Sequence, residues 1–378
     1  MANLFFVHTP FQLFVAQQLI HYKKLVDNIM IYGYIGRNSH SLDLYDIMIM
    51  DEFWKARIYL ENINDWNIFQ IKHPINSYLR TFKTKKWFED ILDKYNITDV
   101  FFGDMNNTCY QLMMLYYQKD SRFKINVYEE GNSHYVNSTQ ASLFGPLSER
   151  LFKCICNNAL YYMPVWRIPF ASYLYLRHIE YEKLKIYKRY SLCPYYHESF
   201  DEQLIPSVIM SEKVREIIND EISNVNTENA FLFLSEPMGE VSSLEWKLEL
   251  LTLERELKTI DSNSTVIIKF HPRETIEKKK DILSVFDRYN QPYKVICEKV
   301  NIPIEYFLQI VNFKKILTYF CSTVFYNGYL FKRTQLYSFM PTYYDLCKEY
   351  RSEFTDEIDM YLNSEYYKKL FGDEYGQV

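Results

Sequence analysis

Short apolar runs alternate with longer amphipathic stretches in the first part of this chain. The runs predict strands at Asn3–His8, Asn28–Ile35, Ile97–Gly103 and Lys124–Glu129, and the stretches predict helices at Phe11–Lys24 and Cys109–Gln118. Strands that alternate with helices indicate a parallel sheet, because parallel strands need a crossover connection.

The same alternation returns after residue 200. Strands are expected at Ala230–Ser235, Thr265–His271, Tyr293–Cys297, Lys315–Phe320 and Gln335–Met340, and helices at Leu244–Ile260 and Ser322–Phe331. Turn-forming residues collect in Pro194–Pro206, which is the expected linker. We therefore expect an α/β fold of two Rossmann-like, doubly wound domains over 1–200 and 207–342. A helical tail over 343–378 is expected to pack back on the first domain.

The composition narrows the class of protein. Hydrophobic residues make up 48% of the 378 residues and charged residues 24%, which is typical of a globular chain. The net charge of −5 and the absence of a long Lys/Arg tract argue against nucleic-acid binding. No glycine-rich phosphate loop occurs among only 9 glycines, which excludes Rossmann dehydrogenases and P-loop ATPases. The 7 cysteines form no C-x-x-C pair and are expected to be reduced thiols.

The sequence also bears on location. The N-terminus lacks a basic region, and Arg167 interrupts the most apolar window, so neither a signal peptide nor a transmembrane helix is predicted. We expect a cytoplasmic protein. The Tyr- and Lys-rich segments Tyr78–Trp87 and Tyr173–Tyr196 suit a membrane interface as well as ordinary solvated helices. Peripheral association with the inner face of the inner membrane therefore stays open.

A pair of carboxylates stands at one expected strand end, in Tyr128-Glu129-Glu130-Gly131. A carboxylate there can take a proton from an attacking hydroxyl, and its neighbour would raise its pKa by like-charge repulsion. Gly131 permits the sharp turn that leaves both at the strand tip. The ordinary alternative is a solvated loop.

Three further motifs follow expected strands in the second half. His271, between Lys269 and Pro272-Arg273, suits binding and protonation of a phosphate leaving group, although a structural histidine is the alternative. Ser322 and Thr323 begin an expected helix, where hydroxyls and free N–H groups bind anions or simply cap the helix. The fourth motif, Ser235-Glu236-Pro237-Met238, otherwise reads as a turn.

Missing motifs narrow the reaction. No Asp-x-Asp and no H-E-x-x-H spacing occurs, which favours chemistry without a metal ion. No G-x-S-x-G marks a serine hydrolase. Of the other histidines, His8 and His134 are the best additional candidates, because each neighbours a strand end that should face the cleft expected between the two domains.

In this order and spacing, Tyr-Glu-Glu-Gly, Lys-Phe-His-Pro-Arg-Glu and Cys-Ser-Thr resemble the motifs of bacterial sialyltransferases. The set is most similar to the capsular polysialyltransferases and the lipooligosaccharide sialyltransferases, glycosyltransferase families 38 and 52. The opening run from Phe5 to Leu13 also looks like that of the lipooligosaccharide enzymes. The resemblance implies a GT-B fold, whose N-terminal domain takes the acceptor and whose C-terminal domain binds the CMP-sugar across a cleft. It also implies metal-independent, inverting transfer from CMP-sialic acid to a hydroxyl of lipooligosaccharide or capsular polysaccharide, with no cofactor.

The resemblance also implies residue roles. Glu130 would be the base, His271 would protonate or contact the departing phosphate, and Ser322 and Thr323 would hydrogen-bond it, with Glu305 on the ribose. The remaining expected donor-site residues are Lys269, Pro272, Ser235, Glu236 and Pro237, and those of the acceptor side or cleft are Glu129, Gly131, Thr9 and Gln12. Two departures from the family pattern are Glu-Glu-Gly in place of a form with Asp and Ser-Thr in place of the commoner Ser-Ser.

Three alternatives remain open from the sequence. The same residues would serve a transferase for another CMP-activated nonulosonic or octulosonic acid. A GT-B-like nucleotide-sugar epimerase would share the architecture without an acceptor. An envelope-assembly partner without catalysis would use the Tyr- and Lys-rich segments to dock on the membrane.

Overall fold

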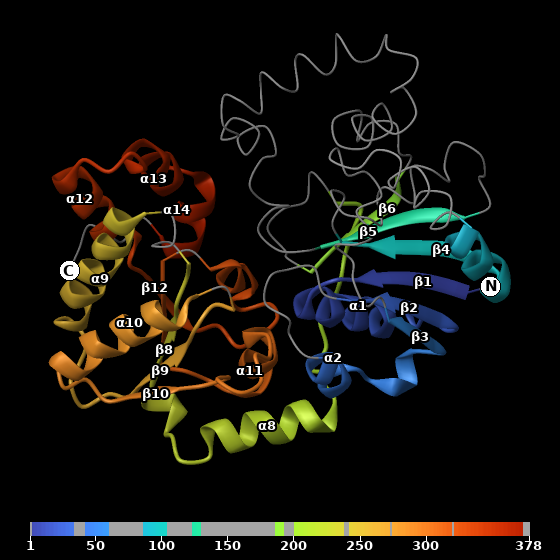
Figure 1. Cartoon of the computed structure of the whole chain (residues 1–378), viewed down its shortest axis with the longest axis horizontal. Helices are drawn as coiled ribbons and strands as arrows, with labels where there is room; N and C mark the ends of the chain where they lie inside the picture. The colour runs from blue at the N-terminus through green and yellow to red at the C-terminus, as the bar shows by residue number, and fades with distance from the viewer. Residues whose placement is uncertain are drawn as a thin grey trace, which may run out of the picture. The chain divides into compact units, whose positions relative to one another are not determined.

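The computed structural model describes residues 2–33, 42–59, 86–103, 123–129, 186–192, 200–237, 242–272, 274–319 and 321–372. Within it the chain divides into two compact units, Met1–Ile209 and Met210–Val378 (Figure 1). Each unit contains one parallel sheet, so each is described by itself.

The first unit is built on a seven-stranded sheet with the strand order β3-β2-β1-β4-β5-β6-β7. Its strands are β1 (Ala2–Val7), β2 (Asn28–Tyr32), β3 (Ala56–Tyr59), β4 (Ile97–Phe102), β5 (Lys124–Tyr128), β6 (Ile186–Ser191) and β7 (Glu202–Gln203). All pairings are parallel, and β1 aligns Asn3 with Asn28 of β2. Among the residues that the structure describes, the helices of this unit are α1 (Pro10–Lys23), α2 (Leu42–Met48), the short 3₁₀ helix η1 (Asp51–Phe53) and a helix over 86–95.

Helix α1 is buried almost all round and fixes two connecting segments through glutamines. Gln17 accepts from the N–H of Met50 at 2.8 Å and donates to the carbonyl of Met48 at 3.3 Å. Gln18 makes the same paired contact with the backbone of Ser207, at 2.8 and 2.9 Å. Because these amides satisfy backbone groups, their burial costs little.

The second unit is built on a five-stranded parallel sheet with the order β10-β9-β8-β11-β12. The strands are β8 (Phe231–Leu234), β9 (Val266–Lys269), β10 (Tyr293–Val295), β11 (Lys315–Thr318) and β12 (Gln335–Ser338). The helices are α8 (Glu212–Ile222), α9 (Ser243–Leu257), α10 (Ile276–Arg288), α11 (Ile304–Ile310), α12 (Met340–Tyr350), α13 (Thr355–Leu362) and α14 (Glu365–Phe371), with 3₁₀ turns η5 (Thr227–Asn229) and η6 (Ser322–Tyr326).

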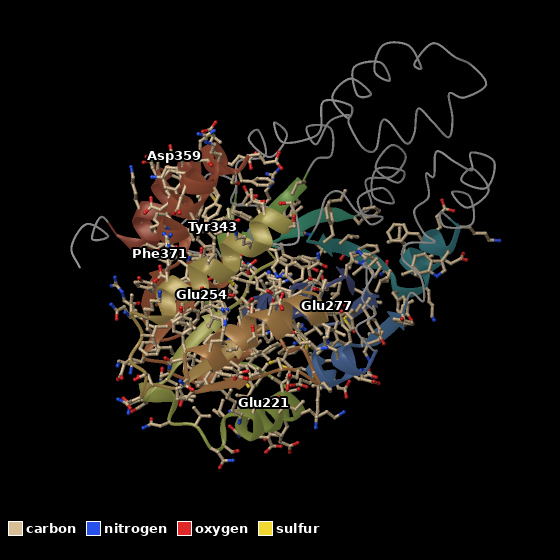
Figure 2. The ribbon with its side chains drawn as sticks, turned by 60° about the vertical axis from the view of Figure 1, so that its left-hand side comes forward. Glu221, Glu254, Glu277, Tyr343, Asp359 and Phe371 are labelled. Atoms are coloured by element: carbon tan, nitrogen blue, oxygen red, sulfur yellow. The ribbon has the colours of Figure 1, made fainter. Side chains whose placement is uncertain are left out.

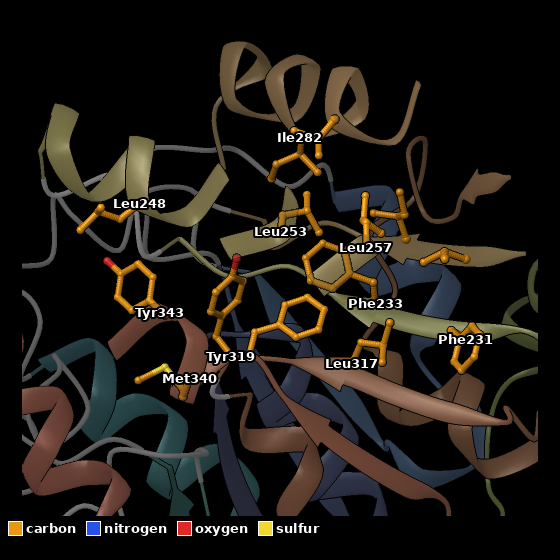
Figure 3. Packing of buried hydrophobic residues seen from close by; sticks show 14 of the residues in the cluster. Phe231, Phe233, Leu248, Leu253, Leu257, Ile282, Leu317, Tyr319, Met340 and Tyr343 are labelled. Atoms are coloured by element: carbon orange, nitrogen blue, oxygen red, sulfur yellow. The ribbon is translucent and has the colours of Figure 1, made fainter. Parts of the chain in front are cut away.

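The core of this unit includes the C-terminal helices. Side chains from α9, β8 and β11 meet in the cluster of Figure 3, where Leu253 and Leu257 lie by Phe233. Tyr343 and Phe371, labelled in Figure 2, belong to the same buried cluster. The described helices of the expected tail over 343–378 belong to the core of the second unit, where α12 packs on α9 and α14 packs on β12.

The two doubly wound α/β units expected from the alternating pattern are confirmed, and each predicted strand is present with its ends shifted by a few residues. The helix expected over Ser322–Phe331 is wrong in length, because only the 3₁₀ helix η6 forms there. Strand β6 lies within Tyr173–Tyr196, so this part of the segment is not one of the solvated helices that the sequence allows as one alternative. The predicted helix Cys109–Gln118 and His134 lie outside the described residues. Among the described helices, none has the length and apolar character that crossing a membrane requires.

Candidate active site

Each sheet has one point where the strand order reverses direction. In the second unit it lies between β8 and β11, and in the first between β1 and β4. Open parallel sheets bind ligands outside the carboxyl ends of their strands at this switch point. In the second unit Ser235 and Glu236 follow β8, while Thr318 closes β11. The fourth sequence motif therefore stands at the switch point itself.

The turn after β8 is held by hydrogen bonds from both sides. Ser235 is 4% exposed, and its hydroxyl donates to Oε1 of Glu274 at 2.6 Å. Thr318 donates to Oε1 of Glu236 at 2.8 Å, which joins the ends of β8 and β11. Pro237 follows, half-buried. The turn thus has one geometry set by two neighbouring strands.

The loop after β9 carries His271 and Pro272, both half-buried. The N–H of His271 donates to Oε2 of Glu274 at 2.7 Å, and the N–H of Glu274 donates back to the carbonyl of His271 at 3.1 Å. Lys269 is 7% exposed, and its ammonium donates to Oδ1 of Asn301 at 2.6 Å. The Lys269 ammonium is therefore bound to Asn301, which is not part of this loop. Arg273 lies outside the described residues.

The third motif forms the start of η6. Thr323 is 2% exposed and donates to Oε1 of Glu305 at 2.7 Å, so its single proton is committed to that carboxylate. The Cys321 thiol lies 3.2 Å from the Thr323 hydroxyl. Burial, with the Glu236 carboxylate nearby, raises the pKa of the Cys321 thiol to about 12, which keeps it protonated at neutral pH. The Ser322 hydroxyl is half-buried and makes no hydrogen bond with any described residue.

Four of the expected site residues therefore come together in two pairs. Ser235 and His271 meet through Glu274, and Thr323 meets Glu305. Glu274 and Thr318 also take part in these contacts, although neither is predicted from the sequence. Glu274 stands in the Lys-Phe-His-Pro-Arg-Glu run, four residues before Lys278, and this helical spacing of opposite charges was a readable signal.

The carboxyl end of β5 carries the first motif. Glu129 is fully buried, and its Oε2 accepts from the Leu192 N–H at 2.6 Å and from the Ser191 hydroxyl at 3.1 Å. It therefore ties β5 to β6. Glu130 and Gly131, which the sequence places next, lie outside the described residues.

The switch point of the first unit carries Thr9 and Gln12. Thr9 caps α1 by accepting from the N–H of Gln12 at 3.1 Å. Gln12 is fully buried and accepts from the His8 N–H at 2.6 Å. Gly103, just after β4, approaches so closely that a Cβ there would lie 2.8 Å from Nε2 of Gln12.

His8 is neutral in the folded chain. Burial lowers its pKa to about 4, and a hydrogen bond with the backbone of Gly33 offsets only part of that effect. At neutral pH the ring thus carries no charge. Within the described ranges, no three His, Cys, Asp or Glu side chains gather in a group that could hold a metal ion.

Three of the solved structures that are similar to this chain match it at low sequence identity. The UDP-GlcNAc 2-epimerase of Methanocaldococcus jannaschii with UDP-GlcNAc and UDP is 14% identical, at a TM-score of 0.46 over 97% of this chain and 94% of that one. The spinosyn rhamnosyltransferase SpnG with thymidine diphosphate is 11% identical, at a TM-score of 0.45 over 100% and 96%. The ADP-heptose lipopolysaccharide heptosyltransferase II of E. coli is 11% identical, at a TM-score of 0.40 over 86% of this chain and 80% of that one.

A comparison of the sequence with curated proteins finds no match. The profile of the family described as alpha-2,8-polysialyltransferase (POLYST) matches residues 3–340. That stretch contains every motif at a strand end, from Thr9 at the first switch point to Thr323 at the start of η6. The chain belongs to the alpha-2,8-polysialyltransferase family.

Proposed function

We propose that this protein is a sialyltransferase that moves sialic acid from CMP-sialic acid to a hydroxyl of a cell-surface glycan, either lipooligosaccharide or capsular polysaccharide. The observation that carries the proposal is the family match over residues 3–340, which includes all the strand-end motifs. The donor would lie at the β8/β11 switch point of the second unit, and no cofactor is required.

Glu130 is the proposed base. Its neighbour Glu129 supports this assignment, because that carboxylate is fully buried and already accepts two hydrogen bonds. Glu129 therefore serves to anchor the strand end, and the next carboxylate is the one left for an acceptor. It removes the proton of the attacking hydroxyl as the new bond to the anomeric carbon forms.

The leaving group is CMP, whose phosphate oxygen takes the electrons of the broken glycosidic bond. His271 and Ser322 are proposed to stabilise that charge, because His271 stands at the end of β9 and the Ser322 hydroxyl has its proton available. Thr323 acts differently, since it orients the Glu305 carboxylate that accepts a ribose hydroxyl. Attack opposite the CMP inverts the anomeric centre. The proposal assigns the stabilisation of the phosphate to these side chains and uses no metal ion.

The location and the acceptor belong to the same proposal. Acceptors that end in lipid are made at a membrane, so peripheral association with the inner membrane would bring enzyme and glycan together.

The test is CMP release from CMP-N-acetylneuraminic acid in EDTA, with and without lactose or oligosialic acid. Wild type is compared with Glu130→Gln and His271→Ala. We expect release that the acceptor stimulates and that both variants lose. If CMP is released only from another CMP-activated acid sugar, that sugar is the donor. Turnover of a UDP-sugar without an acceptor would instead establish an epimerase. If the wild type binds membranes and no nucleotide sugar is converted, the protein is an assembly partner.

A further inference from the structure

A buried ionic cluster lies beneath the two strand-end turns of the second unit. Its centre is Lys278 of α10, which is 1% exposed. The ammonium lies 2.8 Å from Oε2 of Glu249 and 3.1 Å from Oε1 of Glu274, and it donates to the carbonyl of Glu236 at 2.6 Å. An ammonium has three donors, so the three partners use all of them.

Glu274 is the member of the cluster that reaches both turns. One oxygen accepts the Ser235 hydroxyl at 2.6 Å, and the other accepts the His271 N–H at 2.7 Å. The turn after β8 and the loop after β9 are therefore held by a single carboxylate. The ion pair with Lys278 in turn fixes that carboxylate, because Lys278 is locked by Glu249 and by the Glu236 carbonyl.

Stability alone does not account for this arrangement. Burying two carboxylates and one ammonium costs desolvation energy, and apolar residues of similar volume often stabilise a core as well or better. A cluster of this kind is useful where hydrogen bonds must set the geometry of specific groups. Here the groups that are set are the backbone of His271 and the hydroxyl of Ser235.

We propose that Glu274 is a positioning residue for the transfer reaction. It touches no substrate, and it acts by fixing His271 against the leaving phosphate while holding Ser235 at the nucleotide. Lys278 maintains it in this geometry. This inference rests on the proposed function for the role of His271. The contacts of Glu274 with Ser235, His271 and Lys278 do not depend on that function.

The chain offers a matched pair of variants. Glu274→Gln places an amide N–H₂ toward either Lys278 or the His271 N–H, and in both orientations one donor meets another. Glu249→Gln weakens the same buried ion pair with Lys278, but Glu249 lies on α9, which is neither the turn after β8 nor the loop after β9. A purely structural cluster would make the two variants equivalent.

Steady-state kinetics, CMP titration by calorimetry and thermal unfolding are measured for both variants. We expect Glu274→Gln to lower kcat by about 10- to 100-fold, as small misplacements of a reacting group do. The kcat of Glu249→Gln should fall by less than about threefold, although its melting temperature should drop by a similar amount. In the His271→Ala background, Glu274→Gln should add little, because both changes remove the same contribution.

Equal losses of kcat in the two variants, or full additivity with His271→Ala, overturn the positioning role. Failure of the proposed function looks different, since the wild type then releases no CMP. In that case the same two variants are titrated with CMP, UDP, ADP and GDP. The positioning role of Glu274 is supported if Glu274→Gln loses affinity for the nucleotide that the wild type binds and Glu249→Gln does not. Equal affinities in the two variants, or no nucleotide bound by the wild type, refute it.

Discussion

Thr323 donates a hydrogen bond of 2.7 Å to the carboxylate of Glu305, and this one contact divides the roles of two adjacent hydroxyls. The Thr323 proton is used inside the protein, and Ser322 beside it is the hydroxyl that can donate to a ligand. In the proposed reaction the two hydroxyls therefore have different roles, since Ser322 is assigned to the phosphate and Thr323 to Glu305, the residue proposed to bind the ribose.

The first prediction separates these hydroxyls. Ser322→Ala should lower kcat by about 10²-fold, the size of effect seen when one donor to a developing oxyanion is removed. Thr323→Val keeps the shape but removes the hydrogen bond to Glu305, so the KM for the CMP-sugar should rise by about tenfold while kcat changes less. Initial rates over a range of donor concentrations distinguish the two. A kcat loss confined to Thr323→Val would reverse the assignment.

The second prediction concerns His8 and pH. Its pKa is about 4 in the folded chain against 6.5 for a free histidine, so the unfolded chain binds more protons between those values. Stability is therefore complete above about 6.5 and falls as the pH drops toward 4, by up to ~3 kcal/mol. Hydrogen exchange of peptides from β1 and α1 should show this loss in the wild type. His8→Gln should abolish it, and an unchanged pH profile would contradict the buried neutral state.

The third prediction tests the C-terminal helices. Leu346 of α12 is fully buried in the core of the second unit, so Leu346→Ala should cost about 2–5 kcal/mol. Met360 of α13 is 50% exposed, and Met360→Ala should stay within about 0.5 kcal/mol. Urea unfolding of both variants checks the contrast. Equal small effects would mean that α12 is an appendage and not part of the core.

The sequence predicted the strands of both sheets well because parallel strands buried on both faces are short apolar runs, as β8 with its four buried residues shows. It predicted less at the polar ends. The commitment of Thr323 to Glu305 joins residues 18 apart, and Glu129 meets Ser191 across 62 residues. Pairings over such separations depend on strand order, which local patterns do not contain. Helix η6 ends at Tyr326 because Asn327 is extended and its side-chain amide bonds the backbone of Thr334, a pairing that local sequence patterns do not show.

The last prediction concerns the close approach of Gly103 to Gln12. A Cβ at residue 103 would lie 2.8 Å from Nε2 and 3.1 Å from Cδ of Gln12, closer than packed atoms tolerate. Gln12 cannot swing away freely, because it is fully buried and its oxygen accepts from the His8 N–H at 2.6 Å. Gly103→Ala should therefore destabilise the first unit by about 1–3 kcal/mol.

Gln12→Ala supplies the control, because it removes the atoms that the new methyl group would strike. If the clash is the cause, Gly103→Ala should lower the free energy of unfolding much less in the Gln12→Ala background than in the wild type. The difference between the two losses is the coupling energy between the two residues. Hydrogen exchange of peptides from β1 and β4 gives the local stability in all four proteins. Additive losses would place the strain elsewhere, whereas strong coupling would establish that this glycine sets the spacing between β4 and α1 at the switch point, where Thr9 and Gln12 are expected to face the acceptor.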